Sequence, residues 1–295
     1  MLLAILYCFT NLSIEVIAPS SGADETLWKK VEKLIGKKCN NKNLKSSNEQ
    51  VFEDPEKKFK ILDKQLRSDK KILWAIRGGY GCDKIMPFII KNNYRNIPKK
   101  TIVGYSDLTT LQIYLSQEYG WKNVSGLTIK EYFDHLKSKK SKKAMYNYLS
   151  GENKTLVLNN LKPLNKFAEK STKIIGKTTG GNMTSIDNTI GTPWQIQTKN
   201  KILFLEDVNV EGYQLDRVFV HFRNVGIFNN VKAIILGNFG NEKQNKKVYK
   251  KFAKNINIPV FQTNNFGHQK ENLPFGINFD GIIEKSGSLF KITMT

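Results

Sequence analysis

The stretch TIVGYSDLTTLQIYL, residues 101–115, places a serine between a strand pattern and a helix pattern. Its β-branched IV pair favours a short strand, and leucines at helical spacing follow. Ser106 therefore falls in a turn that can expose its side chain and aim backbone N–H groups at an anion. From these residues alone, the alternative is that Ser106 or Asp107 caps the helix that follows.

Two earlier segments have the same form of a strand that runs into a turn. SIEVIAPSSG (13–22) ends in a polar turn, and KKILWAIRGGYG (70–81) ends in a glycine-rich turn. Strands that alternate with helices indicate a parallel sheet with helices on its faces, and ligands bind at the carboxyl ends of such strands. We expect an α/β, parallel-sheet N-terminal domain over residues 13–136.

The second half of the chain has a different pattern. Residues 137–173 are polar and rich in Lys and Asn, and we expect a linker region there. Short strand patterns follow, separated by Gly- and Asn-rich turns, and helical spacing appears over residues 213–228. These patterns indicate a smaller, β-rich mixed α/β C-terminal domain over residues 174–295.

The net charge of +21 raises the question of nucleic-acid binding, but the 47 basic residues comprise 42 Lys and only 5 Arg, beside 30 Asn. Arg is the residue that reads bases bidentately, so we expect no nucleic-acid partner. The run KSKKSKK (137–143) is typical of solvated surface, although the charge attracts anionic substrates generally.

The chain has no apolar run of bilayer length, so we expect no stable membrane insertion. Its beginning, MLLAILYCF, resembles the apolar part of a secretory signal but lacks basic residues before it and a cleavage site after it. A cytoplasmic location is favoured, with export through residues 1–12 left open.

Three cysteines, Cys8, Cys39 and Cys82, form no CxxC motif and indicate neither a disulfide framework nor a zinc site. Cys82 lies beside a glycine cluster without a base near it in sequence, and we expect it to be a packing residue.

The three histidines narrow the search for a general base. His135 and His221 lie in helical or Lys-rich surroundings and are expected to be structural. His268 lies in the loop NNFGHQKENLPFG, where either proton transfer or a bond to the backbone is open. A carboxylate that orients an imidazole is found in ILFLEDV: Glu206 is the better candidate, and Asp207 is expected to cap or form a turn.

Taken in order, the motifs APSS, RGGYG, GYSD, GGN, GTPW, FLEDV, LDR and FGH resemble the LD-carboxypeptidase family of serine peptidases. This family includes the microcin C self-immunity hydrolases. The resemblance extends from about residue 14 to residue 283. Each motif is weak alone, and the ordered set is specific.

The resemblance implies a catalytic triad in the order Ser106, Glu206, His268. It implies an oxyanion hole formed by the backbone N–H groups of Gly79 and Asp107. The active site would lie between the two domains and would need no metal and no cofactor. The family also implies a homodimer.

The resemblance further implies a murein peptide partner and hydrolysis of the LD bond of murein tetrapeptides, with release of terminal D-Ala. Arg77, Tyr80 and Trp194 are the candidates for substrate binding. Two alternatives stay open. One is hydrolysis of a peptidyl-nucleotide antibiotic, for which Trp194 is a platform for the base or, equally, a buried core residue. The other is a non-catalytic basic protein that binds anionic cell-wall fragments or nucleic acid. One departure, NVSGLT (123–128) in place of the family's His-Gly-Pro turn, leaves the shape of the substrate pocket open.

Overall fold

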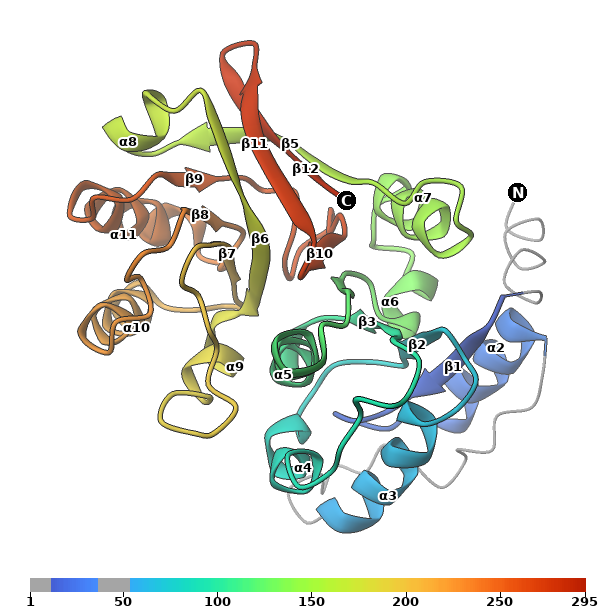
Figure 1. Cartoon of the computed structure of the whole chain (residues 1–295). Coiled ribbons are helices and arrows are strands. Elements are labelled where there is room, and N and C mark those ends of the chain that lie inside the picture. Colours follow the sequence, from blue (N-terminus) through green and yellow to red (C-terminus); the bar gives the residue numbers. More distant parts are fainter. Residues whose placement is uncertain (1–11, 37–53) are drawn as a thin grey trace.

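The computed structural model describes residues 12–36 and 54–295. Two sheets organise these residues (Figure 1): a five-stranded sheet in the order β1-β2-β3-β4-β10, and a closed seven-stranded barrel in the order β11-β12-β5-β9-β8-β7-β6. The predicted α/β class, with a largely parallel N-terminal sheet and a β-rich C-terminal domain, is confirmed.

The first four strands of the N-terminal sheet are parallel to one another. Helices α3, α4 and α5 bury apolar side chains against one face, and α2 buries its apolar stripe in the core on the other. The strands are β1 (Ile14–Ile17), β2 (Ile72–Ala75), β3 (Thr101–Gly104) and β4 (Asn123–Ser125). The helices are α2 (Glu25–Ile35), α3 (Pro55–Leu66), α4 (Cys82–Ile89), the 3₁₀ turn η2 (Ser106–Leu108), α5 (Thr109–Tyr119), α6 (Ile129–Phe133) and α7 (Lys139–Leu149).

The barrel contains a parallel half, β6 to β9, and an antiparallel half. Strand β7 is apolar from Ile202 to Leu205 because both its faces are buried: Phe204 shares a core with Ile292, and Leu205 packs in the core of Phe219 on α10. The strands are β5 (Leu156–Pro163), β6 (Lys173–Asn182), β7 (Lys201–Glu206), β8 (Ala233–Leu236), β9 (Val260–Gln262), β11 (Asp280–Ser286) and β12 (Leu289–Met294). The helices are α8 (Lys166–Glu169), α9 (Met183–Asp187), α10 (Gly212–Asn224) and α11 (Glu242–Lys254).

Strand β10 (Phe275–Ile277) crosses the expected domain boundary. It comes from the C-terminal part of the chain and pairs antiparallel with β4 at the edge of the N-terminal sheet. The segment between β9 and β10 therefore passes from one domain to the other.

The expected linker over residues 137–173 is corrected by the structure. It contains α7 and α8, and β5 is a full strand of the barrel between β12 and β9. Leu156, Leu158 and Leu161 point into the core, while Lys and Asn occupy most of the exposed positions of β5. These polar residues hide the strand pattern in the sequence.

In the described part of the chain, no helix is long and apolar enough to cross a membrane. The apolar run MLLAILYCF (1–9) lies outside the described residues, and so do Cys8 and Cys39. The prediction about export rests on that run and stays a prediction.

We expect Leu158→Ala to lower the free energy of unfolding by about 2–5 kcal/mol, because it opens a cavity inside the barrel. Val157→Ala on the same strand is the control, since this side chain is 38% exposed, and it should cost well under half as much. Urea denaturation followed by circular dichroism measures both. Equal, small effects would contradict a barrel role for β5.

Candidate active site

Ser106 lies in a strained turn at the carboxyl end of β3. Its φ of 65° is in the left-handed region, which a non-glycine residue rarely adopts and which often marks a functional site. Neither Ser106 nor Asp107 caps α5, contrary to the alternative that the sequence left open. Instead, Asp107 Oδ2 accepts the Cys82 N–H at 2.9 Å and caps α4, which has no cap of its own at Gly81.

The turn after β2 lies beside Ser106: a Cβ at Gly78 would be 3.2 Å from Ser106 Cβ, and Gly79 lines the same cleft as Ser106. Gly79 has a φ of 128°, and a Cβ there would lie 1.9 Å from Ser21 Oγ, so only glycine fits. Ser21 Oγ also accepts the Tyr80 N–H at 3.3 Å. Polar residues after β1 therefore support the glycine turn. Cys82, next to this turn, is fully buried, and burial raises the pKa of its thiol well above the ordinary value, as expected of a packing residue.

His268 and Glu206 form a hydrogen-bonded pair. His268 Nδ1 lies 2.8 Å from Glu206 Oε2, and the side chains are 17% and 1% exposed. Glu206 ends β7, and His268 lies in the loop that follows β9. A Cβ at Gly267 would lie 3.0 Å from Glu206 Oε2, so glycine before the histidine allows this close approach. The other ring nitrogen, Nε2, is left for proton transfer.

Asp207, the neighbour of Glu206, caps a helix as expected. Its Oδ2 accepts the Thr184 N–H at 2.8 Å and the Thr184 hydroxyl at 2.6 Å, at the start of α9. Asn182 Nδ2 donates to Asp207 Oδ1 at 2.9 Å and lies 3.4 Å from Glu206 Oε1. Asn182 thus fixes both carboxylates at the end of β7.

The surroundings of His268 have opposing effects on its pKa. Burial lowers the pKa, but the charge and hydrogen bond of Glu206 raise it, and the charges of Glu131 and Asp207 add to this. The net result is a pKa above the ordinary value of 6.5.

Two lobes of a cleft meet at Ser106, Gly79 and Val208. The first lobe, of about 700 Å³, also contains Arg77 and His268. The second lobe, of about 600 Å³, also contains residues Tyr80 and Asp107. The structure therefore places six of the eight predicted site residues along one cleft, with Glu206 directly behind His268.

Trp194 is the exception, and its expected role in substrate binding is corrected. It lines neither lobe and packs instead against the apolar core beneath α3, α4 and α5. The neighbouring Gln195 carbonyl accepts from Gln117 of α5 at 3.0 Å. The sequence left a core tryptophan equally open, and the tertiary packing decides against a place in the cleft.

The two other histidines lie apart from the pair. His221 on α10 lies 2.7 Å from Asp187 Oδ1, which makes it structural as expected. His135 is 90% exposed and lines the outer part of the first lobe. In the part of the chain that the structure describes, no group of three or more His, Cys, Asp or Glu side chains could hold a metal ion.

The segment 123–128, which departs from the family's His-Gly-Pro turn, forms β4 and the start of α6. Asn123 is buried: its Oδ1 accepts the Ile102 N–H at 2.8 Å, and its amide donates to Gln112 O at 2.9 Å. Thr128 caps α6 and is the one member of this segment in the first lobe.

Three residues beside His268 were missed in the sequence. The Tyr105 ring lies 4.6 Å from the His268 ring, and its hydroxyl donates to Glu131 Oε1. Lys137 Nζ lies 2.9 Å from the same carboxylate oxygen. Burial and the charge of Glu131 raise the pKa of Tyr105 well above its ordinary value, so its hydroxyl stays protonated and donates. The three residues are far from His268 in the sequence, and no motif in the sequence links them to it.

Residues 137–141 also hold the loop that carries His268. Lys137 Nζ donates to Gln269 O at 2.9 Å, the Ser138 N–H to Lys270 O at 2.9 Å, and the Asn272 N–H to Ser141 Oγ at 2.9 Å. Lys140 pairs with Glu271 at 2.8 Å. The start of the lysine run is therefore not plain solvated surface, since the Lys137 side chain is only 11% exposed.

We expect the His268 imidazole to titrate above the ordinary pKa of 6.5 by NMR, and Glu206→Gln to lower its pKa, because the charge and hydrogen bond that raise it are lost. A raised pKa in the folded state stabilises the fold most at low pH: the contribution is full below the unfolded pKa and is lost as pH rises through the folded pKa. Glu284→Gln, the same chemical change at a distant ion pair, is the control. An unchanged His268 titration in Glu206→Gln would contradict the pairing.

We expect Lys137→Met to raise hydrogen–deuterium exchange of the amides at 267–272 by about tenfold, because a charged hydrogen bond to this loop is lost. Lys139→Met, an exposed residue of the same lysine run, should leave exchange unchanged. Equal protection in the two variants would show that Lys137 does not hold the loop.

Two family models match the chain: the LD-carboxypeptidase N-terminal domain over residues 14–126 and the LD-carboxypeptidase C-terminal domain over residues 175–280. The ranges fall on the N-terminal sheet and on the barrel, with the cleft between them. Of the triad that the resemblance implied, Ser106 lies in the first range, and Glu206 and His268 lie in the second.

Individual relatives agree. The chain is 39% identical to "Putative carboxypeptidase RC0549" of Rickettsia conorii, over 96% of this chain and 91% of the relative. It is 22% identical to the murein tetrapeptide carboxypeptidase of Pseudomonas aeruginosa, over 70% of this chain and 71% of the relative. The crystal structure of muramoyltetrapeptide carboxypeptidase from Oxalobacter formigenes shares the fold, with a TM-score of 0.77, 20% identity, and coverage of 95% of this chain and 98% of that one. The chain belongs to the LD-carboxypeptidase family.

Proposed function

We propose that this chain is a serine-type carboxypeptidase that hydrolyses the LD bond of murein tetrapeptides and releases terminal D-Ala. One observation carries the proposal: Ser106, in a strained turn, shares a cleft lobe with His268, whose Nδ1 is bonded to the buried Glu206. This is the arrangement that activates a serine hydroxyl through a base and an orienting carboxylate.

In the proposed mechanism, Ser106 Oγ attacks the carbonyl of the LD bond while His268 Nε2 takes the hydroxyl proton. Glu206 keeps the imidazole oriented and stabilises the imidazolium that forms. The oxyanion lies between the backbone N–H groups of Gly79 and Asp107. His268 then gives its proton to the leaving amine of D-Ala, and an ester to Ser106 remains.

Water completes the cycle through the same base. His268 takes a proton from water, the resulting hydroxide attacks the ester, and Ser106 leaves with the proton returned to it. The product peptide now ends in a free carboxylate. Lys30, Arg77 and Lys130 line the first lobe and favour the binding of peptide carboxylates there.

The substrate class rests on relatives named as murein peptide carboxypeptidases, while the antibiotic-cleaving alternative has a similar relative in the microcin C7 self-immunity protein of Escherichia coli, at 25% identity. That alternative needed an aromatic platform, and Trp194 packs away from the cleft. A non-catalytic binding protein has no need of a strained serine or of a buried Glu–His pair.

The test is incubation of the purified protein with a disaccharide tetrapeptide, with D-Ala release followed by mass spectrometry. We expect Ser106→Ala to lower the rate by at least about a thousandfold, as loss of a triad member does. Ser288→Ala, an exposed serine of the β11–β12 hairpin, should keep full activity.

Labelling with a fluorophosphonate probe separates the possible failures. No D-Ala release together with labelling at Ser106 would contradict the murein substrate and move the assignment to another acyl substrate, such as an aminoacyl-adenylate analogue. Neither release nor labelling would overturn the hydrolase proposal.

A further inference from the structure

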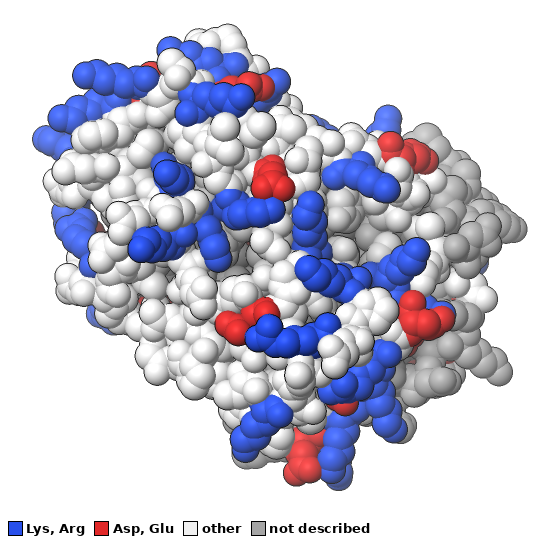
Figure 2. All heavy atoms as spheres, viewed as in Figure 1, with Lys and Arg blue, Asp and Glu red and all other residues white. Residues whose placement is uncertain are grey.

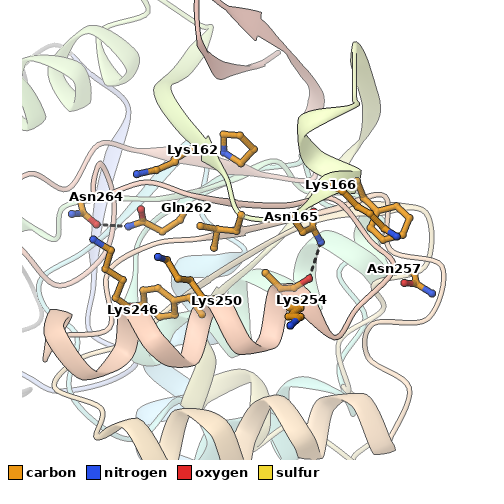
Figure 3. A pocket seen from close by; sticks show the side chains of 14 residues that line it. Lys162, Asn165, Lys166, Lys246, Lys250, Lys254, Asn257, Gln262 and Asn264 are labelled. Atoms are coloured by element: carbon orange, nitrogen blue, oxygen red, sulfur yellow. Dashed lines mark hydrogen bonds between the residues drawn. The ribbon is translucent and has the colours of Figure 1, made fainter.

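A separate groove of about 840 Å³ lies on the outer side of the barrel. It is formed by the end of β5, the start of α8, one face of α11 and residues after β9, and it shares no lining residue with the two lobes at Ser106. Figure 3 shows this groove from close by. The proposed hydrolytic mechanism does not use it.

Five lysines line the groove, and their charge is uncompensated by any described side chain. Among the side chains that the structure describes, no Asp or Glu lines the groove, and none of the five is in an ion pair with an acidic residue. Lys251 on the same helix, by contrast, faces away and pairs with Asp216 at 3.2 Å. The five lysines are Lys162, Lys166, Lys246, Lys250 and Lys254.

The lysines form two rows. Three lie on α11 at intervals of four residues, which corresponds to steps of about 6 Å along the helix. The other two, Lys162 and Lys166, lie on the opposite wall (Figure 3). Charges spread over about 12 Å fit an extended ligand with repeated negative charges better than one compact anion.

The walls are held together without a ligand. Buried Asn165, at the start of α8, donates to Ala253 O near the end of α11 at 3.0 Å and to Ile258 O, between α11 and β9, at 2.8 Å. Gln262 and Asn264 add neutral polar groups at one end of the groove (Figure 3). The groove is therefore preorganised, which lowers the cost of binding.

The lysine surface of this chain is extensive. Figure 2 shows that basic side chains far outnumber acidic ones on the face it displays. What distinguishes the groove is concavity: exposed lysines on a convex surface diverge, whereas here two rows face one another. Lysine supplies point charges without the planar fork of arginine, so it attracts phosphates regardless of any base attached to them.

We propose that this groove binds a linear chain of phosphate groups. Inorganic polyphosphate and the phosphodiester backbone of a single-stranded nucleic acid share this chemistry. Contact would be with the charges alone. A nucleic acid held in this way would go against the expectation of no nucleic-acid partner, which rested on the scarcity of base-reading Arg. The ligand would release counterions and bind with a steep salt dependence.

The test is fluorescence anisotropy with a short labelled oligothymidylate and the full chain, at salt concentrations from about 50 to 200 mM. Five lysine contacts predict a loss of affinity of about a hundredfold over this range. Lys246→Glu combined with Lys250→Glu should weaken binding by at least about tenfold and flatten the salt dependence, because two contacts are lost.

The matched control is Lys243→Glu combined with Lys247→Glu. These lysines are exposed on the same helix and change the net charge equally, but they do not line the groove. We expect their variant to bind within about threefold of the original protein. Thermal unfolding checks that both variants are folded.

Competition identifies the ligand source. Displacement of the oligothymidylate by inorganic polyphosphate, but not by orthophosphate at the same total phosphorus concentration, supports a chain ligand. The ligand that binds more tightly, polyphosphate or oligothymidylate, identifies the source. Absence of binding at low salt, or equal loss in both double variants, would overturn the groove as a site. Equal displacement by orthophosphate would overturn the chain ligand.

Discussion

The arrangement of the site depends on fixing one loop, residues 263–274, between two domains. The loop leaves the barrel at β9 and continues into β10, which pairs with β4 of the N-terminal sheet. Residues 137–141 bond to its middle, next to His268. Proton transfer requires heavy atoms within hydrogen-bond distance, and a loop anchored only at its ends would sample many wrong positions. The crossing strand and the lateral bonds remove that freedom.

Both domains direct the carboxyl ends of parallel strands at the same cleft. Ser106 follows β3 of the sheet, while Asn182 and Glu206 end β6 and β7 of the barrel in register with each other. The docking is direct, since the Asn182 N–H donates to Thr109 Oγ1 at the start of α5 at 3.0 Å. Strand ends are the natural place for a site in such sheets, because the turns there are free to vary without disturbing the core.

The sequence predicts those parts of the site that have a local sequence pattern. A local pattern marks each of three elements: the turn at Ser106, the strand that ends in Glu206 and the glycine-containing loop at His268. The order of the motifs along the chain then indicated that the three belong to one site. Sequence reasoning could not find β10 as a partner of β4, because strand pairing is a long-range property. It also missed Tyr105, Glu131 and Lys137, whose importance comes only from their meeting around one imidazole.

Two errors have a common physical origin. The strand over Leu156–Pro163 was hidden because its exposed side is mostly Lys and Asn, the residues with which this chain covers its surface. Lys137 was assigned to solvated surface for the same reason, although it is largely buried. A biased composition weakens the contrast between inner and outer positions, so polarity alone says less about burial here than in an average protein.

The electrostatics of the His268–Glu206 pair explain why burial does not prevent the proposed role of His268 as a base. A buried imidazole alone would resist protonation, because its charged form loses hydration. Glu206 is 1% exposed, and in the described chain its hydrogen-bonding partners are Asn182 and His268, neither of them a permanent cation. The buried carboxylate is therefore best compensated when His268 is protonated, and this is the state that a general base reaches during nucleophilic attack. Lys137 pairs with Glu131, while burial and the charge of Glu131 keep the Tyr105 hydroxyl protonated, so that a neutral ring packs on the imidazole. The burial that makes the pair costly to break also strengthens the attraction between Glu206 and a protonated His268, which in the proposed mechanism forms during the attack by Ser106.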